Sequence, residues 1–261
     1  MRKTTAIEWA EVVWNAATGC DRVSPGGDHC YMFPIAEWQR RMGTANYRNG
    51  ARYTEHPDLL EHPLGVKKPS RFFVNSMSDM FHERATQPFV FTMLRTMLTA
   101  DWHTFIVLTK RPGRMRNWVG QFCDEEGLER LPAHIWLGHS VENQAWADVR
   151  IPQLIQTRCT VRLLSCEPLL GLVDLAPWLA GLDWVICGGE SGREHRPMDL
   201  DWARRLRDQC VRSGTAFFYK QSGGRHPGTG RELDGRCWEE YPTTNEVRPP
   251  VTRQLVLLTE A

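Results

Sequence analysis

The sequence has no long apolar run and no excess of charge of one sign. Its 261 residues carry 32 basic and 31 acidic side chains, so the net charge is +1. Balanced charge creates no global field that would draw the protein to nucleic acid or to a membrane surface. No apolar stretch approaches the roughly 20 residues that cross a bilayer, and residues 1–5 do not resemble a signal peptide. We therefore expect no membrane partner.

The chain also lacks a disulfide framework and a hydrolase motif. Its eight cysteines are scattered, and Cys187 and Cys210 lie inside apolar runs. This distribution is typical of reduced thiols and predicts a cytoplasmic protein. No Gly-x-Ser-x-Gly sequence occurs, which argues against a serine hydrolase of the nucleophile-elbow type. A chain of this length can bury one large core, so we expect a single domain over residues 1–261.

Short apolar, β-branched runs recur along the chain and alternate with amphipathic helical stretches. Continuous apolar runs are typical of parallel strands that are buried on both faces. Repeated strand–helix units predict an α/β fold, a full or partial (β/α) TIM-like barrel, with an open doubly wound sheet as the alternative. The predicted strands are Val12–Trp14, Arg71–Val74, Thr104–Leu108, Ile135–Leu137, Val161–Leu164, Trp184–Ile186 and Phe217–Tyr219.

Local signals place three helices and an irregular tail. Pro88 suits the first turn of a helix. Asp199 or Asp201 suits the N-cap of another, which Gly214 would end. An apolar pattern predicts a helix over residues 35–42. The Gly-, Pro- and Arg-rich residues 223–261 predict an irregular cover over one barrel end, with residues 254–258 as a last strand.

Two cysteines lie in one Gly-rich loop directly after the first predicted strand. Cys20 and Cys30 flank this loop, and Gly27 stands where a Cys-x-x-Cys pair would have its first member. Thiolates are the protein ligands that iron–sulfur clusters use. The loop therefore holds either ordinary thiols or an iron site with one ligand missing. Asp28 and His29 lie beside the gap as substitute ligands.

Nearly every predicted strand is followed at once by polar or ionisable residues. In a parallel barrel the active site forms at the carboxyl ends of the strands, so these residues should meet at one rim, together with the cysteine loop. They are Asn75, Ser76, Ser78, Asp79, Thr109, Lys110, Arg111, His139, Ser140, Glu142, Asn143, Ser165, Cys166, Glu167, Cys187, Gly188, Gly189, Glu190, Ser191, Lys220 and Gln221.

The order of these motifs resembles one family. The motifs are Gly19-Cys20, Cys30-Tyr31, residues 75–82 (NSMSDMFH), 108–112 (LTKRP), 140–142 (SVE), 167–171 (EPLLG), 188–192 (GGESG) and 220–221 (KQ). In combination they resemble the phage-associated three-cysteine family, which is regarded as radical S-adenosylmethionine (SAM)-like. The resemblance covers about residues 7 to 242. The family's loop normally has a middle cysteine, where this chain has Gly27.

The resemblance implies a barrel of the radical SAM type with a [4Fe–4S] cluster and SAM. Cys20 and Cys30 would ligate iron, and Tyr31 would pack beside the adenine of SAM. Ser140 and Glu142 would contact its ribose or its methionine end. A cluster held by two thiolates should be labile unless another ligand completes it.

Three residues after the sixth predicted strand would border the cofactor or the substrate. Gly188 and Gly189 would let the backbone approach a ligand closely because they lack side chains. Glu190 would be a polar contact. A tight strand-to-helix turn is the alternative reason for the two glycines.

Charged residues predict an anionic substrate at the barrel mouth. Lys110, Glu167 and Lys220 are the candidate catalytic residues, and the cations, Arg111 among them, would bind a phosphate, a carboxylate or a nucleotide. Ion pairing with Asp79, Glu167 or Glu190 is the alternative.

Two basic stretches with interleaved aromatic residues admit nucleic acid as a partner. Solvated basic faces are the alternative. The stretches are Arg111, Arg114 and Arg116 with Trp118, and Arg40, Arg41, Tyr47, Arg48 and Arg52 with Tyr53.

These observations predict an enzyme that acts by radical chemistry on an anionic substrate. The alternative is a degenerate barrel that lacks a redox cluster and binds a ligand or a partner. A zinc site is a further hypothesis, in which Cys20, His29 and Cys30 are joined by Cys166 or Cys187.

Overall fold

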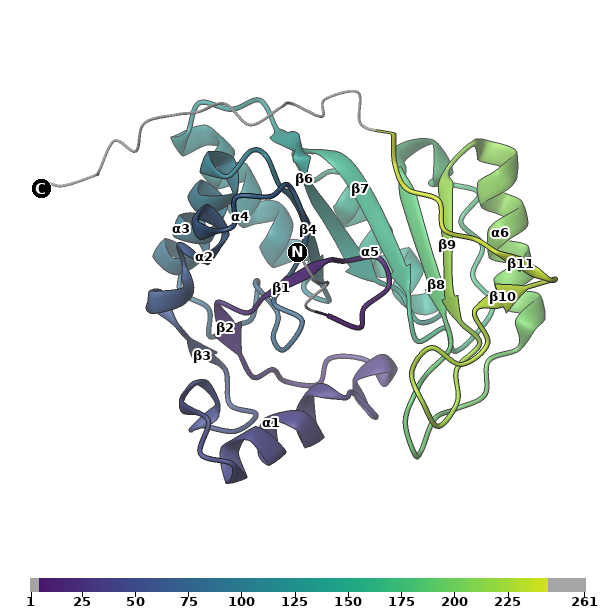
Figure 1. Ribbon diagram of the computed structural model, residues 1–261. Coiled ribbons are helices and arrows are strands. Elements are labelled where there is room, and N and C mark those ends of the chain that lie inside the picture. The colour runs from purple at the N-terminus through teal and green to yellow at the C-terminus, as the bar shows by residue number, and fades with distance from the viewer. Residues whose placement is uncertain (1–4, 244–261) are drawn as a thin grey trace, which may run out of the picture.

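Seven parallel strands form the central sheet of the protein. The structure is a computed structural model that describes residues 5–243 (Figure 1). The strands lie side by side in the order in which they occur in the chain. They are β1 (Val12–Trp14), β4 (Arg71–Val74), β5 (Thr104–Thr109), β6 (Leu131–Ser140), β7 (Cys159–Cys166), β8 (Trp184–Gly188) and β9 (Ala216–Gln221).

The sequential strand order makes this sheet a partial barrel. Every crossover runs in the same direction, so the connecting helices fall on one face. The sheet curls away from them, and β1 and β9 are its two outermost strands (Figure 1). The segment around Glu239 pairs with the outer side of β9. The partial (β/α) barrel is confirmed. The doubly wound alternative is wrong, because it requires the strand order to reverse and helices on both faces. The main helices are α3 (Gln87–Thr99), α4 (Pro112–Glu125), α5 (Gln144–Ile155) and α6 (Leu200–Ser213).

Alternate strand residues enter two different cores. Val107, Leu137 and Val185 pack against the helices in the larger core. On the concave face a smaller core contains Trp9, which meets Phe73 edge to face at 4.6 Å between ring centroids. The other inward members include Ile106, Trp136, Val161, Leu163, Trp184, Ile186 and Phe218. Side chains point to alternate faces along a strand. A strand-end residue therefore faces the barrel interior when it lies an even number of positions from one of these inward residues, and we say that such residues have the same parity.

Helix boundaries follow the capping residues. Asp199 caps α6 by accepting a hydrogen bond from the Asp201 backbone N–H at 2.9 Å, and Gly214 ends the helix with φ 74°. Pro88 lies in the first turn of α3 as predicted. The helix predicted over residues 35–42 is α1 (Met32–Arg41) and begins earlier. Within residues 5–243, every helix is too short or too polar to cross a membrane.

Smaller elements complete the part of the chain that the structure describes. The strands β2 (Ala17–Thr18) and β3 (Thr54–Glu55) pair with each other, as do β10 (Glu232–Leu233) and β11 (Arg236–Cys237). The short helices are η1 (Pro25–Gly27), η2 (Ala45–Tyr47), η3 (Pro57–Leu59), α2 (His62–Gly65) and η4 (Leu179–Gly181). Beyond β11, the Trp238 carbonyl accepts a hydrogen bond from the Tyr219 N–H at 2.8 Å. The predicted strand at residues 254–258 lies outside the described residues.

Five strands are longer than predicted. β6 and β7 extend by several residues, and each of β5 to β9 includes residues that were expected in the following loops. Ser140, Ser165, Gly188 and Lys220 are therefore held within strands at the rim. Polar residues at a strand end still make ladder hydrogen bonds, and the apolar run alone underestimates the strand length.

Candidate functional site

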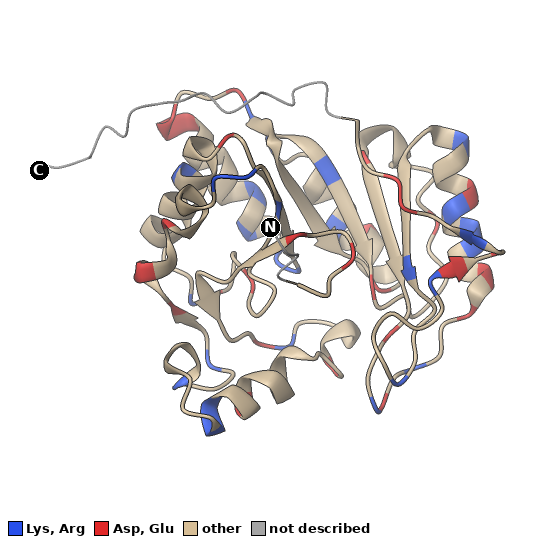
Figure 2. Ribbon diagram, in the orientation of Figure 1, with Lys and Arg blue, Asp and Glu red and all other residues tan. Residues whose placement is uncertain are grey.

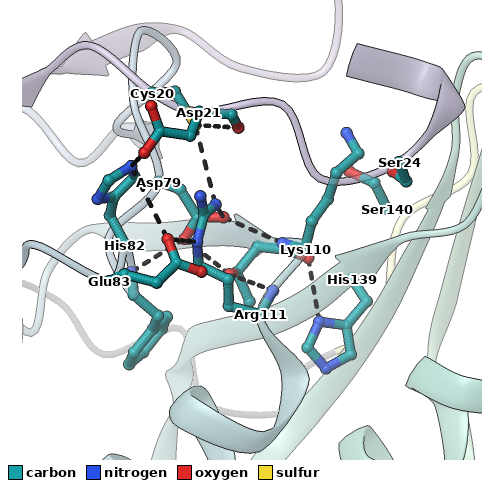
Figure 3. Close-up of polar contacts among 12 residues, drawn as sticks. Cys20, Asp21, Ser24, Asp79, His82, Glu83, Lys110, Arg111, His139 and Ser140 are labelled. Atoms are coloured by element: carbon teal, nitrogen blue, oxygen red, sulfur yellow. Dashed lines mark hydrogen bonds and ion pairs between the residues drawn. The ribbon is translucent and has the colours of Figure 1, made fainter. Parts of the chain in front are cut away.

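The cysteine loop lies against the carboxyl ends of the strands (Figure 3). Its first part is held near β4, where the Gly19 N–H donates to the Met77 carbonyl at 2.9 Å. Its middle is tied to the end of β6, because Ser24 Oγ donates to Glu142 Oε1 at 2.6 Å. The loop and the strand ends therefore form one rim, as predicted.

Glu142 is the buried anchor of this loop. Its carboxylate is fully buried and pairs with Arg150 Nη1 at 2.8 Å, while Arg150 also donates to the Ser140 carbonyl at 2.7 Å. A side chain at Gly26 would place its Cβ 2.6 Å from Glu142 Cγ, so only glycine fits there. The carboxylate predicted to contact the cofactor is thus engaged by the protein's own loop and by α5.

The two loop cysteines share one small apolar cluster. Cys20 and Cys30 pack, partly buried, against Met32, Ala36 and Met77. Burial and the nearby Asp79 carboxylate raise the pKa of Cys20 to about 11, although Arg111 Nη1 approaches its Sγ at 3.8 Å. Without a metal, Cys20 is therefore a thiol and not a thiolate at neutral pH.

Gly27 leaves room for a side chain. A Cβ at this position would meet Arg22 at 3.5 Å, which is ordinary van der Waals contact. The two substitute ligands also contact other residues: Asp28 pairs with Arg196 at 3.5 Å, and His29 Nδ1 lies 3.0 Å from Glu190 Oε2, which leaves His29 Nε2 as the ring nitrogen able to bind a metal.

Among the described residues, only two cysteine thiols lie at the loop, one fewer than a three-cysteine cluster site needs. Cys166 and Cys187 are fully buried in the core on the helix side of the sheet, with Cys123, Cys159 and Cys210. Cys237 is exposed on β11. The zinc hypothesis is wrong for the same reason, because Cys166 and Cys187 point away from the loop.

Asp79 organises a second buried network under the loop (Figure 3). Its carboxylate accepts hydrogen bonds from Thr109 Oγ1 at 2.7 Å, from the Lys110 N–H at 3.0 Å and from Arg111 Nη1 at 2.8 Å. Arg111 Nε also donates to Glu83 Oε2 at 2.7 Å. Arg111 is therefore part of the scaffold, as the ion-pairing alternative predicted.

One group near the loop has the composition of a metal site. Asp21, His82 and Glu83 bring their ligand atoms within 4.8 Å of one another. However, His82 Nδ1 accepts a hydrogen bond from the Arg84 N–H at 3.0 Å, so a neutral ring carries its proton on Nε2. Nε2 lies 3.2 Å from Asp21 Oδ2 but makes no hydrogen bond to it. Because Nε2 carries the proton and Nδ1 accepts from Arg84, the neutral ring offers no lone pair to a metal.

Inward-facing polar residues line the mouth of the barrel. Ser140, Ser165, Gly188 and Lys220 have the same parity as the inward residues Trp136, Leu163, Ile186 and Phe218 of their own strands. Lys110 follows β5 with the parity of Ile106 and extends toward Ser24 and Ser140 (Figure 3). His139, Cys166 and Cys187 have the opposite parity and belong to the helix side. The rim thus divides into an inner and an outer face.

The mouth cations have carboxylate neighbours, as the ion-pairing alternative predicted. Lys220 Nζ forms a short ion pair with Glu167. Lys110 Nζ lies 3.6 Å from Glu142 Oε1, beyond hydrogen-bond distance, and is partly exposed. Among the described residues, Lys110 is therefore the mouth cation with donors to spare.

Gly188, the last residue of β8, and Gly189, which follows it, differ in how much room they have for a side chain. A Cβ on Gly189 would lie 2.0 Å from the Ser222 carbonyl oxygen. The close approach of the backbone in this turn therefore explains why residue 189 is a glycine. A Cβ on Gly188 would meet Glu167 at 3.5 Å, which is ordinary contact. Gly188 keeps the mouth open beside Glu167 and Lys220, whereas Gly189 is needed for the fold.

Glu190 clamps the far end of the loop. Burial opposes its ionisation, but hydrogen bonds from Arg196 and His29 lower the pKa of Glu190 to about 2. Arg196 donates its backbone N–H to Glu190 at 2.8 Å and Nη2 to the Pro25 carbonyl at 2.9 Å. The predicted polar contact for a cofactor instead connects the loop to the segment after β8.

Tyr31 lies at the start of α1, close to the rim. Its hydroxyl donates to the Ser76 carbonyl at 2.7 Å, and 48% of the residue is exposed. The ring is therefore fixed in orientation and accessible to a flat ligand.

The first basic stretch with aromatic residues is engaged within the fold. Arg111 belongs to the Asp79 network. Arg114 lies over the Trp118 ring at 3.9 Å and donates to the Ala85 carbonyl at 2.8 Å. In the second stretch the arginines are exposed, but Tyr53 is buried and stacks on His82 at 4.5 Å between ring centroids, so it offers no platform. The arginines around α1 remain the candidate surface for nucleic acid.

Several anchoring residues were not found from the sequence. Ser24 and Arg196 lie in irregular segments without a recognisable pattern. Arg150 did carry a signal, since it occupies the same helical face as the buried Ala147, Ile151 and Leu154. A charged residue on an apolar stripe predicts a buried partner.

Comparisons with known proteins give one family and a set of distant structural similarities. The structure of spore photoproduct lyase complexed with dinucleoside spore photoproduct has 13% sequence identity and a TM-score of 0.42, over 77% of this chain and 61% of that chain. A cysteine-to-serine mutant of spore photoproduct lyase has 13% identity and a TM-score of 0.44, over 82% of this chain and 77% of that one. This chain thus matches less than two thirds of the first of these structures. No curated protein matches the sequence significantly. A family model described as a protein of unknown function, DUF5131, matches residues 4–242, and the chain belongs to this family.

Proposed function

We propose that this protein is a radical SAM-like protein that binds SAM at the inner face of the rim. The observation that carries the proposal is the inner face itself. Lys110, Ser140, Ser165, Gly188 and Lys220 come from five successive strands and face one mouth, beside a loop with two cysteines. Ligands of parallel α/β barrels bind at this end of the strands.

The residues of the mouth suit a ligand that has both a charged end and hydroxyl groups. Lys110 would contact the carboxylate of SAM, because its ammonium is held by no short ion pair. Ser140 offers a hydroxyl 8% exposed at the mouth for a ribose or amine group. Gly188 leaves space for the ligand, and Tyr31 offers a fixed ring for its base.

An anionic substrate would bind between the same strands. Lys220 and Glu167 form a partly exposed ion pair beside Gly188. A phosphate or carboxylate could replace Glu167 as the partner of Lys220, which would free Glu167 to accept a proton. We therefore assign Lys110 to cofactor binding and the Lys220–Glu167 pair to the substrate.

The iron–sulfur cluster is the incomplete part of this assignment. Cys20 and Cys30 would hold iron, and the cluster would supply reductive cleavage of SAM. The loop has no thiolate at the Gly27 position, Asp28 is paired with Arg196, and His29 Nδ1 is paired with Glu190. We therefore expect iron in the wild-type chain to be labile.

Calorimetric titration of SAM into the protein tests this proposal. Wild type should bind SAM, and Lys110→Ala should bind it about tenfold more weakly, the magnitude of one charge-assisted hydrogen bond. Arg205→Ala is the matched control, since Arg205 is an exposed cation on α6. Failure of wild type to bind SAM would overturn the proposal, as would equal loss in the two variants.

A further inference from the structure

Helix α1 has two apolar faces, and only one of them is used by the fold. Met32 and Ala36 are buried and pack with Met77. Arg22 lies over the Phe33 ring at 4.4 Å and covers the helix start. Apart from the Tyr31 hydroxyl, which donates to the Ser76 carbonyl, these contacts anchor the helix to the protein.

The second apolar face is open to solvent. Tyr31, Ile35, Trp38 and Met42 follow one another at intervals of four, three and four residues, so they lie on one side of the helix. They are 48%, 39%, 57% and 66% exposed. We call these four residues the α1 stripe. Contiguous exposed apolar residues of this size mark interaction surfaces.

The surroundings of the α1 stripe are basic. Residues 31–53 contain four arginines and one glutamate, which gives a local charge of +3 in a chain whose total is +1. Arg40, Arg41, Arg48 and Arg52 are all exposed. Glu37 pairs with Arg40 at 2.7 Å and with Arg41 at 3.0 Å, so one carboxylate is shared by two cations. Figure 2 shows blue at the C-terminal end of this helix.

The charge and the aromatic rings together select the partner. A second copy of the chain would bring two +3 surfaces together, which disfavours self-association. An anionic polymer with flat rings matches both features, because bases stack on exposed aromatic side chains while arginines contact phosphates. Tyr31 and Trp38 lie two turns apart, about 10 Å along the helix.

We propose that the α1 stripe binds single-stranded nucleic acid by stacking a base on Trp38, its most exposed aromatic ring. The exposed Arg41 and Arg48 contact the phosphates. Tyr31 follows Cys30 directly, so a strand bound along α1 ends beside the rim. This inference goes beyond SAM binding and does not require it.

The probe is a fluorescein-labelled oligothymidylate of about 15 nucleotides, near the upper site size of such surfaces. Fluorescence anisotropy should show binding that weakens as salt is raised. Trp38→Ala should weaken binding about tenfold, and Arg41→Glu should also lower the salt dependence. The matched controls are Val211→Ala and Arg212→Glu, exposed residues on α6 that should bind as wild type does.

Three results would overturn the inference. The first is no binding of the oligonucleotide by folded wild type at low salt. The second is equal loss in the α1 variants and the α6 controls. The third is a different occupant, shown by binding to phosphatidylserine vesicles but not to the oligonucleotide, or by a dimer that Trp38→Ala converts to monomer. A SAM titration of Trp38→Ala separates the two proposals, because this variant should retain wild-type SAM affinity.

Discussion

The two faces of the rim use similar polar residues for different purposes. On the outer, helix-side face, Asp79 and Arg111 are paired and Glu142 is locked to Arg150, all within buried surroundings. On the inner face, Lys110 and Lys220 remain partly exposed. The outer network holds the loop in place, whereas the partly exposed inner lysines are the ones that we propose for ligand binding.

The difference shows that position at a strand end does not by itself indicate function. Side chains one residue apart on a strand point to opposite faces. His139 is fully buried on the helix side, and the neighbouring Ser140 reaches the mouth. Outer-face substitutions should therefore change stability, and inner-face substitutions should change ligand binding.

Arg150→Ala should produce the largest loss of stability. It removes the hydrogen-bonded cation of the fully buried Glu142 carboxylate and leaves only Lys110 at 3.6 Å; breaking a buried pair typically costs about 3–5 kcal/mol. Urea denaturation measures the change in the free energy of unfolding. Arg205→Ala, on an exposed part of α6, should change it by less than about 0.5 kcal/mol. Similar changes in the unfolding free energy of the two variants would contradict the role of Glu142 as the anchor of the loop.

Gly188, at the end of β8, and the next residue, Gly189, test the difference between stability and ligand binding at adjacent positions. Gly189→Ala should destabilise by about 1–3 kcal/mol, because its Cβ would lie 2.0 Å from a backbone oxygen. Gly188→Ala should leave the unfolding free energy nearly unchanged and weaken SAM binding. Thermal unfolding together with calorimetry distinguishes them, and the reverse pattern would contradict the assignment of Gly188 to the mouth.

Acid should destabilise the outer face first. Burial lowers the pKa of His139 from 6.5 to about 4, so the unfolded state binds more protons between these values. The contribution of His139 to stability is complete above pH 6.5 and is lost as the pH falls toward 4. His139→Gln should flatten the stability curve in this window, measured by urea denaturation at each pH. His226→Gln, on an exposed segment, should not.

A second loss of stability at lower pH is expected from Glu190, which holds the far end of the loop. Hydrogen bonds from Arg196 and His29 lower the pKa of Glu190 from 4.5 to about 2, despite its burial. Its contribution is present above pH 4.5 and is lost as the pH falls toward 2. Glu190→Gln should remove this lower step and leave the His139 step intact. An unchanged lower step would show that Glu190 does not hold the loop.

Gly27→Cys should have the smallest effect on stability and the clearest effect on metal content. The new Cβ would make only ordinary contacts, so the free energy of unfolding should change by less than about 0.5 kcal/mol. After anaerobic reconstitution, iron and sulfide analysis should show about four irons per chain in the variant and labile iron in wild type. Equal iron in both would contradict the assignment of residue 27 as the missing ligand position.

The sequence predicted the strands and their common rim because apolar runs and their spacing are local signals. All seven predicted strands occur in the sheet. The pairing of the polar residues could not be predicted in the same way. Ser24 reaches Glu142 over 118 residues and Arg196 reaches Pro25 over 171, and no local pattern records such contacts. For Arg111, ion pairing with Asp79 was one of the two alternatives, and only the folded chain decides in its favour.

A crystal structure of the protein soaked with SAM tests the central claim most directly. We predict density for SAM on the inner face, with its carboxylate near Lys110 and its remaining groups between Ser140 and Gly188. Density on the helix side of the sheet, or an unchanged mouth at saturating SAM, would contradict the assignment of the inner face as the ligand site.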